Sequence, residues 1–175
     1  MLKLNIKNET SRLRAVVLGI ATNNGPVPKV EACYDSKSVQ HVIAGTYPKE
    51  EDMNIEMEAV AAILEKYNVE VFRPKVIENY NQIFSRDIAF VIDDKLVKAN
   101  ILPDRDQEIE AINHVISNID AVNIIKLPEE CHVEGGDVMP WNDYIFVGTY
   151  SGDDYSDYIT ARTNVDAVIA LQELF

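Results

Sequence analysis

The residues of this chain that are best suited to chemistry lie in two short segments: Asn81, Phe84 and Asp87 in the run NQIFSRD, and Glu134 in the run HVEGGD. An amide, a flat ring and a carboxylate at three-residue steps can bind, stack on and neutralise a planar cation. Carboxylates that face one pocket can hold a guanidinium by paired, charge-assisted hydrogen bonds. The two segments therefore predict a site for a planar, positively charged group.

Simpler interpretations of the same residues stay open. Asp87 could cap a turn or pair with its neighbour Arg86, and Glu134 could be solvated beside a β-bulge at the two glycines. Asp137 could be a turn residue or a buried support for the site. His132 and Glu134 are two residues apart on a predicted strand, so their side chains are expected on the same face. A single histidine in such a position is more often a hydrogen-bonded neighbour of a site than a catalyst, and we expect that role for His132.

Two arginines could bind the carboxylate of a substrate by a two-point contact, because Arg105 and Arg162 begin or precede helices. Solvation at the surface is the alternative for both. No nucleophile is convincing: Cys33 and Cys131 lack flanking cations that would favour a thiolate. The chain has no phosphate-binding loop, dinucleotide fingerprint or zinc-protease motif, so we expect neither a metal nor a cofactor.

Composition limits the class of protein. The chain has 175 residues, 47% hydrophobic and 26% charged, which fits one globular domain with a core. A net charge of −13 opposes binding to nucleic acid and to anionic membranes, and it suits a cationic small molecule. Neither a membrane-length apolar run nor a signal peptide is found. With only two cysteines, far apart, a reduced cytoplasmic location is expected.

The elements that must position these residues repeat along the chain, and we expect one domain of three modules over residues 1–80, 81–130 and 131–175. In the first module, residues 14–20 form a strand, 21–46 a long loop and 69–73 a second strand. Between them, a helix begins near Pro48 with an acidic first turn. Its expected buried face consists of Met53, Met57, Val60, Ala61 and Leu64.

The second module is predicted to be a hairpin over residues 88–99, then a helix that buries Ile109, Ile112 and Ile116, and then a strand over 121–127. The third has a hairpin that turns near Asn142. Thr163 with Asp166 is typical of a capping box. The helix that follows is expected to present Val165, Val168, Ile169 and Gln172 on one face.

Asp87 and Glu134 lie 47 residues apart, which suits a repeat of hairpin, helix and strand. The third module lacks the closing strand, so we expect an unfilled sheet edge and an uncovered apolar strip. This pattern favours the N-terminal part of a longer architecture or one half of an assembly. Two copies could also pair through the open edge as a homodimer.

The motifs resemble those of the guanidino-group-modifying superfamily, which includes arginine deiminases, dimethylarginine dimethylaminohydrolases and amidinotransferases. Residues 81–87 are similar to its N-x-x-F-[ST]-R-D element, 134–138 to its EGGDV element and 11–19 to its opening strand. Arg105 with Glu108 falls where the family has an R-x-x-E helix start, and residues 162–164 fall at its R-T-N segment. The similarity extends over nearly the whole chain.

This resemblance implies an α/β fold: an incomplete α/β propeller of ββαβ modules, about three of five pseudosymmetric units, with the active site on the axis. It implies that a cysteine thiolate attacks the guanidinium carbon and forms an amidino-cysteine, with a histidine as acid and base. By matching position, Asp87 would anchor the guanidinium, and Glu134 would bind it and shuttle protons. Asn81 and Phe84 would line the pocket, while Arg105 and Arg162 would bind the substrate carboxylate.

The catalytic histidine and cysteine of the family have no counterpart at matching positions in this chain. We therefore expect the chain alone to be an inactive, guanidinium-binding part of a guanidine-modifying enzyme. The run over residues 84–100 favours an amidinotransferase over a hydrolase of arginine or dimethylarginine. The alternative is a non-catalytic binding protein on the same propeller, although retained Asp87, Glu134 and Asn81 would then be idle.

Overall fold

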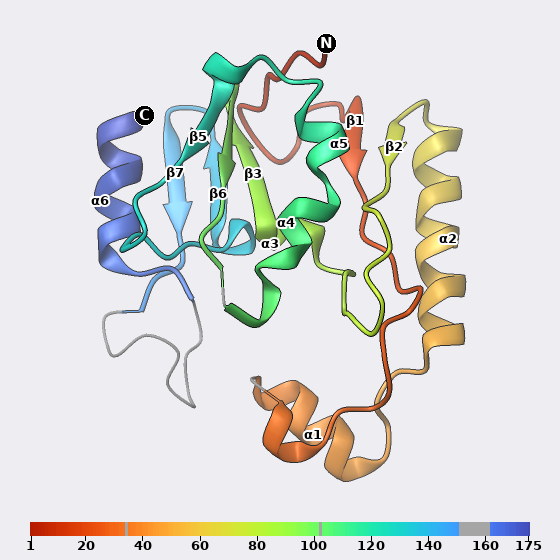
Figure 1. Ribbon diagram of the computed structural model, residues 1–175. Helices are drawn as coiled ribbons and strands as arrows, with labels where there is room; N and C mark the ends of the chain where they lie inside the picture. The colour runs from red at the N-terminus through yellow and green to blue at the C-terminus, as the bar shows by residue number, and fades with distance from the viewer. Residues whose placement is uncertain (34, 102, 151–161) are drawn as a thin grey trace. The chain divides into compact units, whose positions relative to one another are not determined.

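The computed structural model describes residues 1–33, 35–101, 103–150 and 162–175, except for the side chain of residue 104 (Figure 1). The chain divides into two compact units. One contains Met1–Leu13 and the described residues from Phe84 onward, and the other contains Arg14–Ile83. Each unit is mixed α/β, as the sequence predicts. The expected division into three modules within a single domain stays a prediction.

The unit Arg14–Ile83 is built around two parallel strands, β1 (Ala15–Val17) and β2 (Glu70–Phe72). The 17-residue helix α2 (Glu50–Lys66) connects them and has an acidic first turn, as expected. Its buried face is smaller than the methionine spacing predicts, because only Ala61 is fully buried and Val60 is exposed. A sheet of two strands offers too narrow a surface to cover a broad helix face.

One part of this unit differs from the prediction of a long loop over residues 21–46. The segment contains a short 3-10 turn, η1 (Val30–Ala32), and a nine-residue helix, α1 (Ser36–Ala44). Asp35 caps α1 by accepting a hydrogen bond from the Ser38 N–H at 2.8 Å, and Gly45 ends it in the left-handed conformation. These caps are present in the sequence, but the glycines and prolines that precede them favour the loop interpretation.

The other unit contains a complete ββαβ arrangement. Strands β3 (Ala89–Ile92) and β4 (Lys95–Lys98) form the expected hairpin, with Asp93 at a positive φ of 50° in the turn. The chain returns through η2 (Pro103–Arg105), α4 (Gln107–Ala111), α5 (Asn113–Ile116) and η3 (Ala121–Asn123) to β5 (Ile124–Lys126), which pairs with β4 in parallel. The one-turn helix α3 (Ser85–Ile88) leads into β3.

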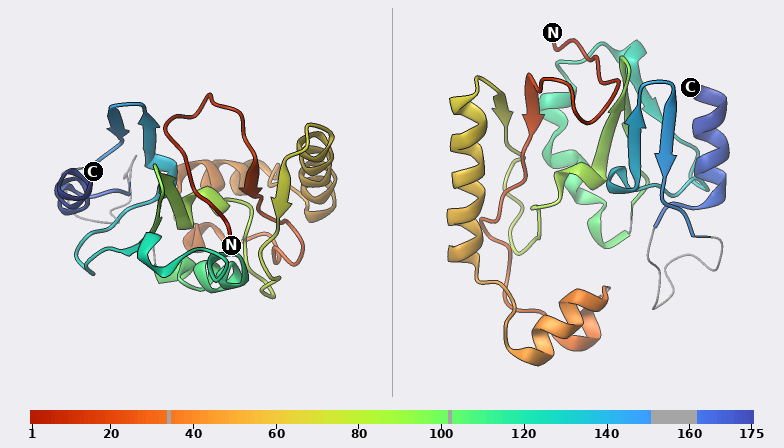
Figure 2. Two further views of the ribbon diagram at one scale, coloured as in Figure 1. Left: turned by 90° about the horizontal axis from the view of Figure 1, so that it is seen from above. Right: turned by 180° about the vertical axis from the view of Figure 1, so that it is seen from behind.

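A second hairpin of the same unit joins β6 (Val138–Trp141) to β7 (Tyr144–Val147) after the turn η4 (Gly135–Asp137). The helix α6 (Val165–Leu174) lies alongside this hairpin (Figure 2). One prediction about α6 is wrong, because Asn164, not Thr163, caps it by accepting from the Ala167 N–H. The buried residues of α6 are Ala167 and Leu171, which lie outside the predicted stripe of Val165, Val168, Ile169 and Gln172.

The core of this unit lies between the β3–β4–β5 sheet, the β6–β7 hairpin and α6. It contains nine buried residues: Phe90, Ile92, Val97, Leu127, Cys131, Val133, Val138, Ala167 and Leu171. The described strands form three separate sheets, and no closed ring of modules occurs among the described residues. Among the described helices, none is long and apolar enough to cross a bilayer.

Candidate functional site

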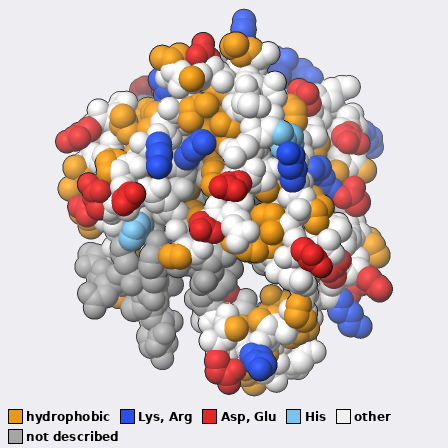
Figure 3. All heavy atoms as spheres, in the orientation of Figure 1, with side chains coloured by type: hydrophobic (Ala, Val, Ile, Leu, Met, Phe, Trp, Pro, Cys, Tyr) orange, Lys and Arg blue, Asp and Glu red, His pale blue; other side chains and the backbone are white. Residues whose placement is uncertain are grey.

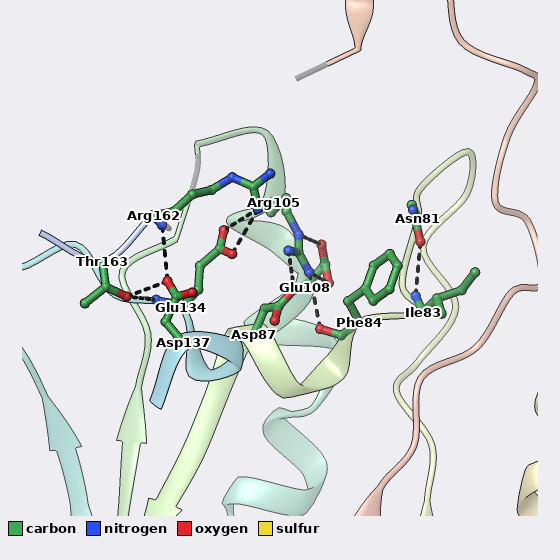
Figure 4. Close-up of polar contacts among 10 residues, drawn as sticks. All are labelled: Asn81, Ile83, Phe84, Asp87, Arg105, Glu108, Glu134, Asp137, Arg162 and Thr163. Carbon is green, nitrogen blue, oxygen red and sulfur yellow. Dashed lines mark hydrogen bonds and ion pairs between the residues drawn. The ribbon is translucent and has the colours of Figure 1, made fainter. Parts of the chain in front are cut away.

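Asp87 lies in the one-turn helix α3, directly before strand β3, and its carboxylate pairs with an arginine (Figure 4). Arg105 Nη1 donates to Asp87 Oδ2 at 2.8 Å, and Arg105 Nη2 donates to the Phe84 carbonyl at 3.3 Å. Asp87 therefore does not pair with its neighbour Arg86. Its carboxylate joins α3 to η2, the short 3-10 turn that ends at Arg105.

Arg105 is buried, and a second carboxylate completes its surroundings. Its Nε and Nη2 donate to the two oxygens of Glu108 at 2.7 and 3.0 Å. Arg105 and Glu108, three residues apart in the chain, are thus joined by two parallel hydrogen bonds. Burial opposes the charged form of Arg105, but its hydrogen bonds and ion pairs with Glu108 and Asp87 outweigh burial and raise its pKa. Arg105 therefore stays charged.

Glu134 precedes the turn η4 and is also buried, and Arg162 pairs with it. Arg162 Nη1 donates to the two Glu134 oxygens at 3.0 and 3.3 Å. Burial raises the pKa of Glu134, the charge of Arg162 opposes that rise, and the charge of Asp87 adds to it. The charge of Asp87 thus acts on the ionisation of Glu134, although 47 residues separate the two in the chain.

Asp137 and Thr163 are hydrogen-bonded to each other, and Thr163 is also bonded to the backbone of Glu134. The Thr163 hydroxyl donates to Asp137 Oδ2 at 2.7 Å and accepts from the Glu134 N–H at 3.3 Å, and Thr163 is fully buried. The Arg162 N–H also donates to Asp137 Oδ2, at 3.1 Å. The Asn164 side chain and backbone pair with the backbone of His132. Residues 162–164 therefore hold the extended segment that carries Glu134, which is not part of a β-strand.

Arg86 and the two glycines join the Asp87 and Glu134 segments. Arg86 donates to the Gly135 and Val138 carbonyls at 2.9 and 2.7 Å, and it pairs with Glu9. A Cβ at Gly135 would overlap the Arg86 carbonyl oxygen, and one at Gly136 would lie 2.6 Å from Asp87 Oδ1. Only glycine permits this approach, so the glycines bring the carboxylate of Asp87 against the turn that follows Glu134.

The remaining predicted residues lie in different surroundings. The Phe84 ring is 57% exposed, as a stacking surface requires. Asn81 accepts a hydrogen bond from the Ile83 N–H at 3.1 Å and belongs to the Arg14–Ile83 unit, so its place in the site stays a prediction. The side chain of His132 lines a cavity whose lining residues include neither Asp87 nor Glu134.

Neither cysteine has the surroundings of a nucleophile. Burial raises the pKa of the Cys131 thiol, and the charges of Glu130 and Asp166 add to the rise. For Cys33, burial and then Asp35 and Glu31 act in the same direction. A raised pKa keeps a thiol protonated and unreactive near neutral pH. Within the described residues, no group of three histidine, cysteine or acidic side chains is arranged to hold a metal.

Sequence reasoning underestimated Glu108, Thr163 and Arg86. The pairing of Glu108 with Arg105 could have been predicted from the spacing Arg-x-x-Glu at a helix start, because residues three apart lie side by side on a helix. Thr163 was interpreted as a helix cap, and Arg86 as a local partner of Asp87. The true partners of Thr163 and Arg86 are 26 to 77 residues away in the chain, and no local pattern reports such contacts.

Comparison with known proteins identifies the fold. No protein-family model matches the chain. The uncharacterized protein YkgA of Bacillus subtilis is 27% identical over 161 residues, which are 87% of this chain and 52% of that protein.

Several solved structures are similar. The amidinotransferase SxtG of the saxitoxin pathway from Microseira wollei has a TM-score of 0.70 at 18% identity, over 97% of this chain and 58% of that one. The inosamine-phosphate amidinotransferase StrB1 from Streptomyces griseus has a TM-score of 0.65 at 14% identity, and the match covers 99% of this chain and 60% of that one. A dimethylarginine dimethylaminohydrolase has a TM-score of 0.61 at 13% identity, and the match covers 91% of this chain and 54% of that one.

These likenesses confirm the expected fold at a coarse level. The chain has part of the fold of the guanidino-group-modifying superfamily, matched over most of its own length. It spans about half the length of the curated relative and 54 to 60% of the three solved chains.

Proposed function

We propose that this chain supplies the guanidinium-binding carboxylates of an enzyme that acts on guanidino compounds such as arginine. One observation carries the proposal: Asp87 and Glu134, from separate segments, lie in one charged network with Arg105 and Arg162. Asp87, Glu108, Glu134 and Asp137 outnumber the two arginines, so the network carries excess negative charge. An added guanidinium would reduce that excess and be oriented by the carboxylates.

In the proposed mechanism, Asp87 neutralises one edge of the ligand guanidinium, and Glu134 contacts the other and exchanges a proton with it. The raised pKa of Glu134 suits proton exchange, because an acid group transfers protons best when its pKa approaches the working pH. The cation would replace Arg162 at Glu134, and Arg162 would then face the substrate carboxylate, whereas Arg105 would keep its contacts with Asp87 and Glu108. A cysteine thiolate outside this network would attack the guanidinium carbon. The bond from that carbon to the substrate nitrogen would break, the amine would leave with a proton, and the amidino-cysteine intermediate would remain.

Titration of the chain with L-arginine tests the binding step. We expect Asp87→Asn and Glu134→Gln each to weaken the affinity by about tenfold or more, because each removes a charge-assisted contact. The matched controls are Asp93→Asn, in the exposed β3–β4 turn, and Glu173→Gln on α6, and both should bind normally. Equal affinity in all four variants would favour the alternative of a binding protein that uses another surface of the fold.

Transfer and hydrolysis differ in what resolves the covalent intermediate, an amine or water. We favour transfer, because the two solved structures with the highest TM-scores given above are named as amidinotransferases. The test uses the longest natural polypeptide that contains this chain, supplied with L-arginine and an amine acceptor. Acceptor-dependent formation of ornithine and a new guanidine supports transfer. Citrulline formed at the same rate without acceptor supports the hydrolase alternative.

Homodimerisation is a separate proposal with its own observation. One face of the β6–β7 hairpin exposes two cross-strand pairs, Met139 with Phe146 and Trp141 with Tyr144. Exposed apolar groups of this size favour association. Light scattering over a hundredfold range of concentration should detect a dimer, and Trp141→Lys should abolish it. A monomer at every concentration contradicts the proposal.

A further inference from the structure

A cavity of about 690 Å³ lies in the unit that contains the carboxylate network, but other residues line it. Its walls come from the ends of β4 and β5, the start of α4 and residues 99–101. Arg105 and Glu108 contact the carboxylate network, whereas Asp106 and Ile109, their neighbours in sequence, line the cavity. The start of α4 therefore separates two sites.

One wall of the cavity is basic. Lys98 and Lys126 both line it and are Cα partners at the ends of the parallel strands β4 and β5. Neighbouring strands lie about 5 Å apart, so the two side chains start close together on one face. Neither lysine makes an ion pair with any described residue. Two ammonium groups that repel each other favour an anion placed between them.

Another part of the wall, at the start of α4, is acidic, and Glu129 after β5 is a further acid of the lining. Asp106 and Glu110 are four residues apart at the start of α4, which places them on the same side of the helix, and both line the cavity. In the described part of the chain, neither makes an ion pair with Lys98 or Lys126, so the opposite charges are more than 4.0 Å apart. A ligand that bridges the walls must separate its own charges by a comparable distance.

The rest of the cavity wall is partly apolar, and hydrogen bonds of Asn100 hold the loops that form it. Ala99, Ile101 and Ile109 contribute apolar surface. Asn100 Nδ2 donates to the Pro128 and Cys131 carbonyls at 2.7 and 3.1 Å, which ties the loop after β4 to the loop after β5. Figure 3 shows basic and acidic side chains interspersed with hydrophobic ones on the face of the molecule that it views.

We propose that this cavity binds a linear zwitterion, an ω-amino acid whose carboxylate contacts Lys98 and Lys126 and whose ammonium contacts Asp106 and Glu110. The methylene chain would lie on the apolar surface between them. An α-amino acid with an uncharged side chain has its ammonium and its carboxylate on one carbon and cannot reach both walls. The proposal does not depend on guanidinium binding, because the two sites share no side chain.

The test is an NMR titration of the isotope-labelled chain with 6-aminohexanoate, observed at the amides of Ala99, Asn100 and Ile109. Hexylamine and hexanoate at the same ionic strength serve as singly charged controls. We expect saturable shifts with 6-aminohexanoate and about fivefold weaker binding of each control, because one partly exposed charge contact contributes about that factor. A series from 4-aminobutanoate to 8-aminooctanoate should show one optimal length.

Variants assign the two ends. Lys126→Gln should bring 6-aminohexanoate down to the affinity of hexylamine, and Glu110→Gln should bring it down to that of hexanoate. Lys66→Gln and Glu65→Gln on α2 are matched controls, and Asp87→Asn should also leave binding unchanged. Hexanoate that binds as tightly as 6-aminohexanoate, shifts that never saturate, or equal losses in the α2 controls would each overturn the proposal.

Discussion

Arg105 and Arg162 each pair with an acidic residue of the network, but they are held differently. The Arg105 side chain is 6% exposed and donates to Asp87, Glu108 and the Phe84 carbonyl. Arg162 is 22% exposed and contacts both Glu134 oxygens through one nitrogen, Nη1. The buried Glu108 and the half-buried Asp87 fix Arg105 in place, whereas a ligand can compete for Glu134 at lower cost. The Arg105 region is thus a frame for Asp87, and the Arg162 region is the part that can exchange partners.

The largest expected effect is on stability. Arg105→Gln leaves the buried Glu108 and the half-buried Asp87 without their cation, which should lower the free energy of unfolding by about 3–5 kcal/mol. Arg162→Gln should cost only about 1–2 kcal/mol, because its pair is more exposed. Urea unfolding followed by circular dichroism measures both losses. The control is Arg12→Gln at an exposed position, whose free energy of unfolding should stay within about 0.5 kcal/mol of the wild type. Equal losses at Arg105 and Arg162 would remove the distinction between frame and exchangeable partner.

A smaller effect is expected where Thr163 supports the exchangeable side. Thr163→Val keeps the shape but removes the hydroxyl that bridges Asp137 and the Glu134 N–H, which should cost about 1–3 kcal/mol. Thr163→Ser keeps the hydroxyl and should recover most of that loss. In NMR spectra the Glu134 amide should shift in the valine variant and less in the serine variant. A valine variant as stable as the wild type would show that Thr163 does not position Glu134.

The pH dependence of Glu134 sharpens the comparison further. Burial, offset in part by Arg162 and increased by Asp87, raises its pKa above the usual value of about 4.3. The native state then binds the proton more tightly than the unfolded state. Its contribution to stability is therefore complete below about pH 4.3 and is lost as the pH rises through the raised pKa.

Carboxyl-carbon NMR titration measures this pKa directly. Asp87→Asn should lower the pKa of Glu134 by removing a nearby negative charge, and Arg162→Gln should raise it by removing a positive one. Glu134→Gln should flatten the fall in stability above about pH 4.3. A pKa for Glu134 at or below its usual value, unchanged by Asp87→Asn, would contradict the electrostatic link between the two segments.

The smallest effect concerns Phe84, whose ring is exposed and whose carbonyl contacts Arg105. Phe84→Ala should change the stability by no more than about 0.5 kcal/mol, because little ring surface is buried. On the proposed function, it should weaken L-arginine binding about two- to fivefold by removing a cation–π contact. Phe84→Tyr, which keeps the aromatic face, is the matched control. Affinity that is the same in all three proteins would exclude Phe84 from the site.

Local patterns predicted the hairpins well and the helix surfaces poorly. Asp93 and Asn142 have positive φ values in two-residue turns, and aspartate and asparagine tolerate that conformation, so the turns are encoded at those positions. Helix α6 was expected near the right place, but the sequence did not indicate which of its faces is buried. Its sequence offers apolar residues on more than one side, and only the packing of Ala167 and Leu171 against the core selected between them.

By itself, the sequence determined which residues carry charge at the two motifs, and it placed glycines where backbone and side chain must approach closely. These properties are local, because residue type and backbone freedom do not depend on distant partners. Tertiary structure alone decided which acid meets which arginine: Asp87 with Arg105, and Glu134 with Arg162. Ion pairing in a buried site requires groups from separate segments to converge within hydrogen-bonding distance, and only the packed fold brings these groups together.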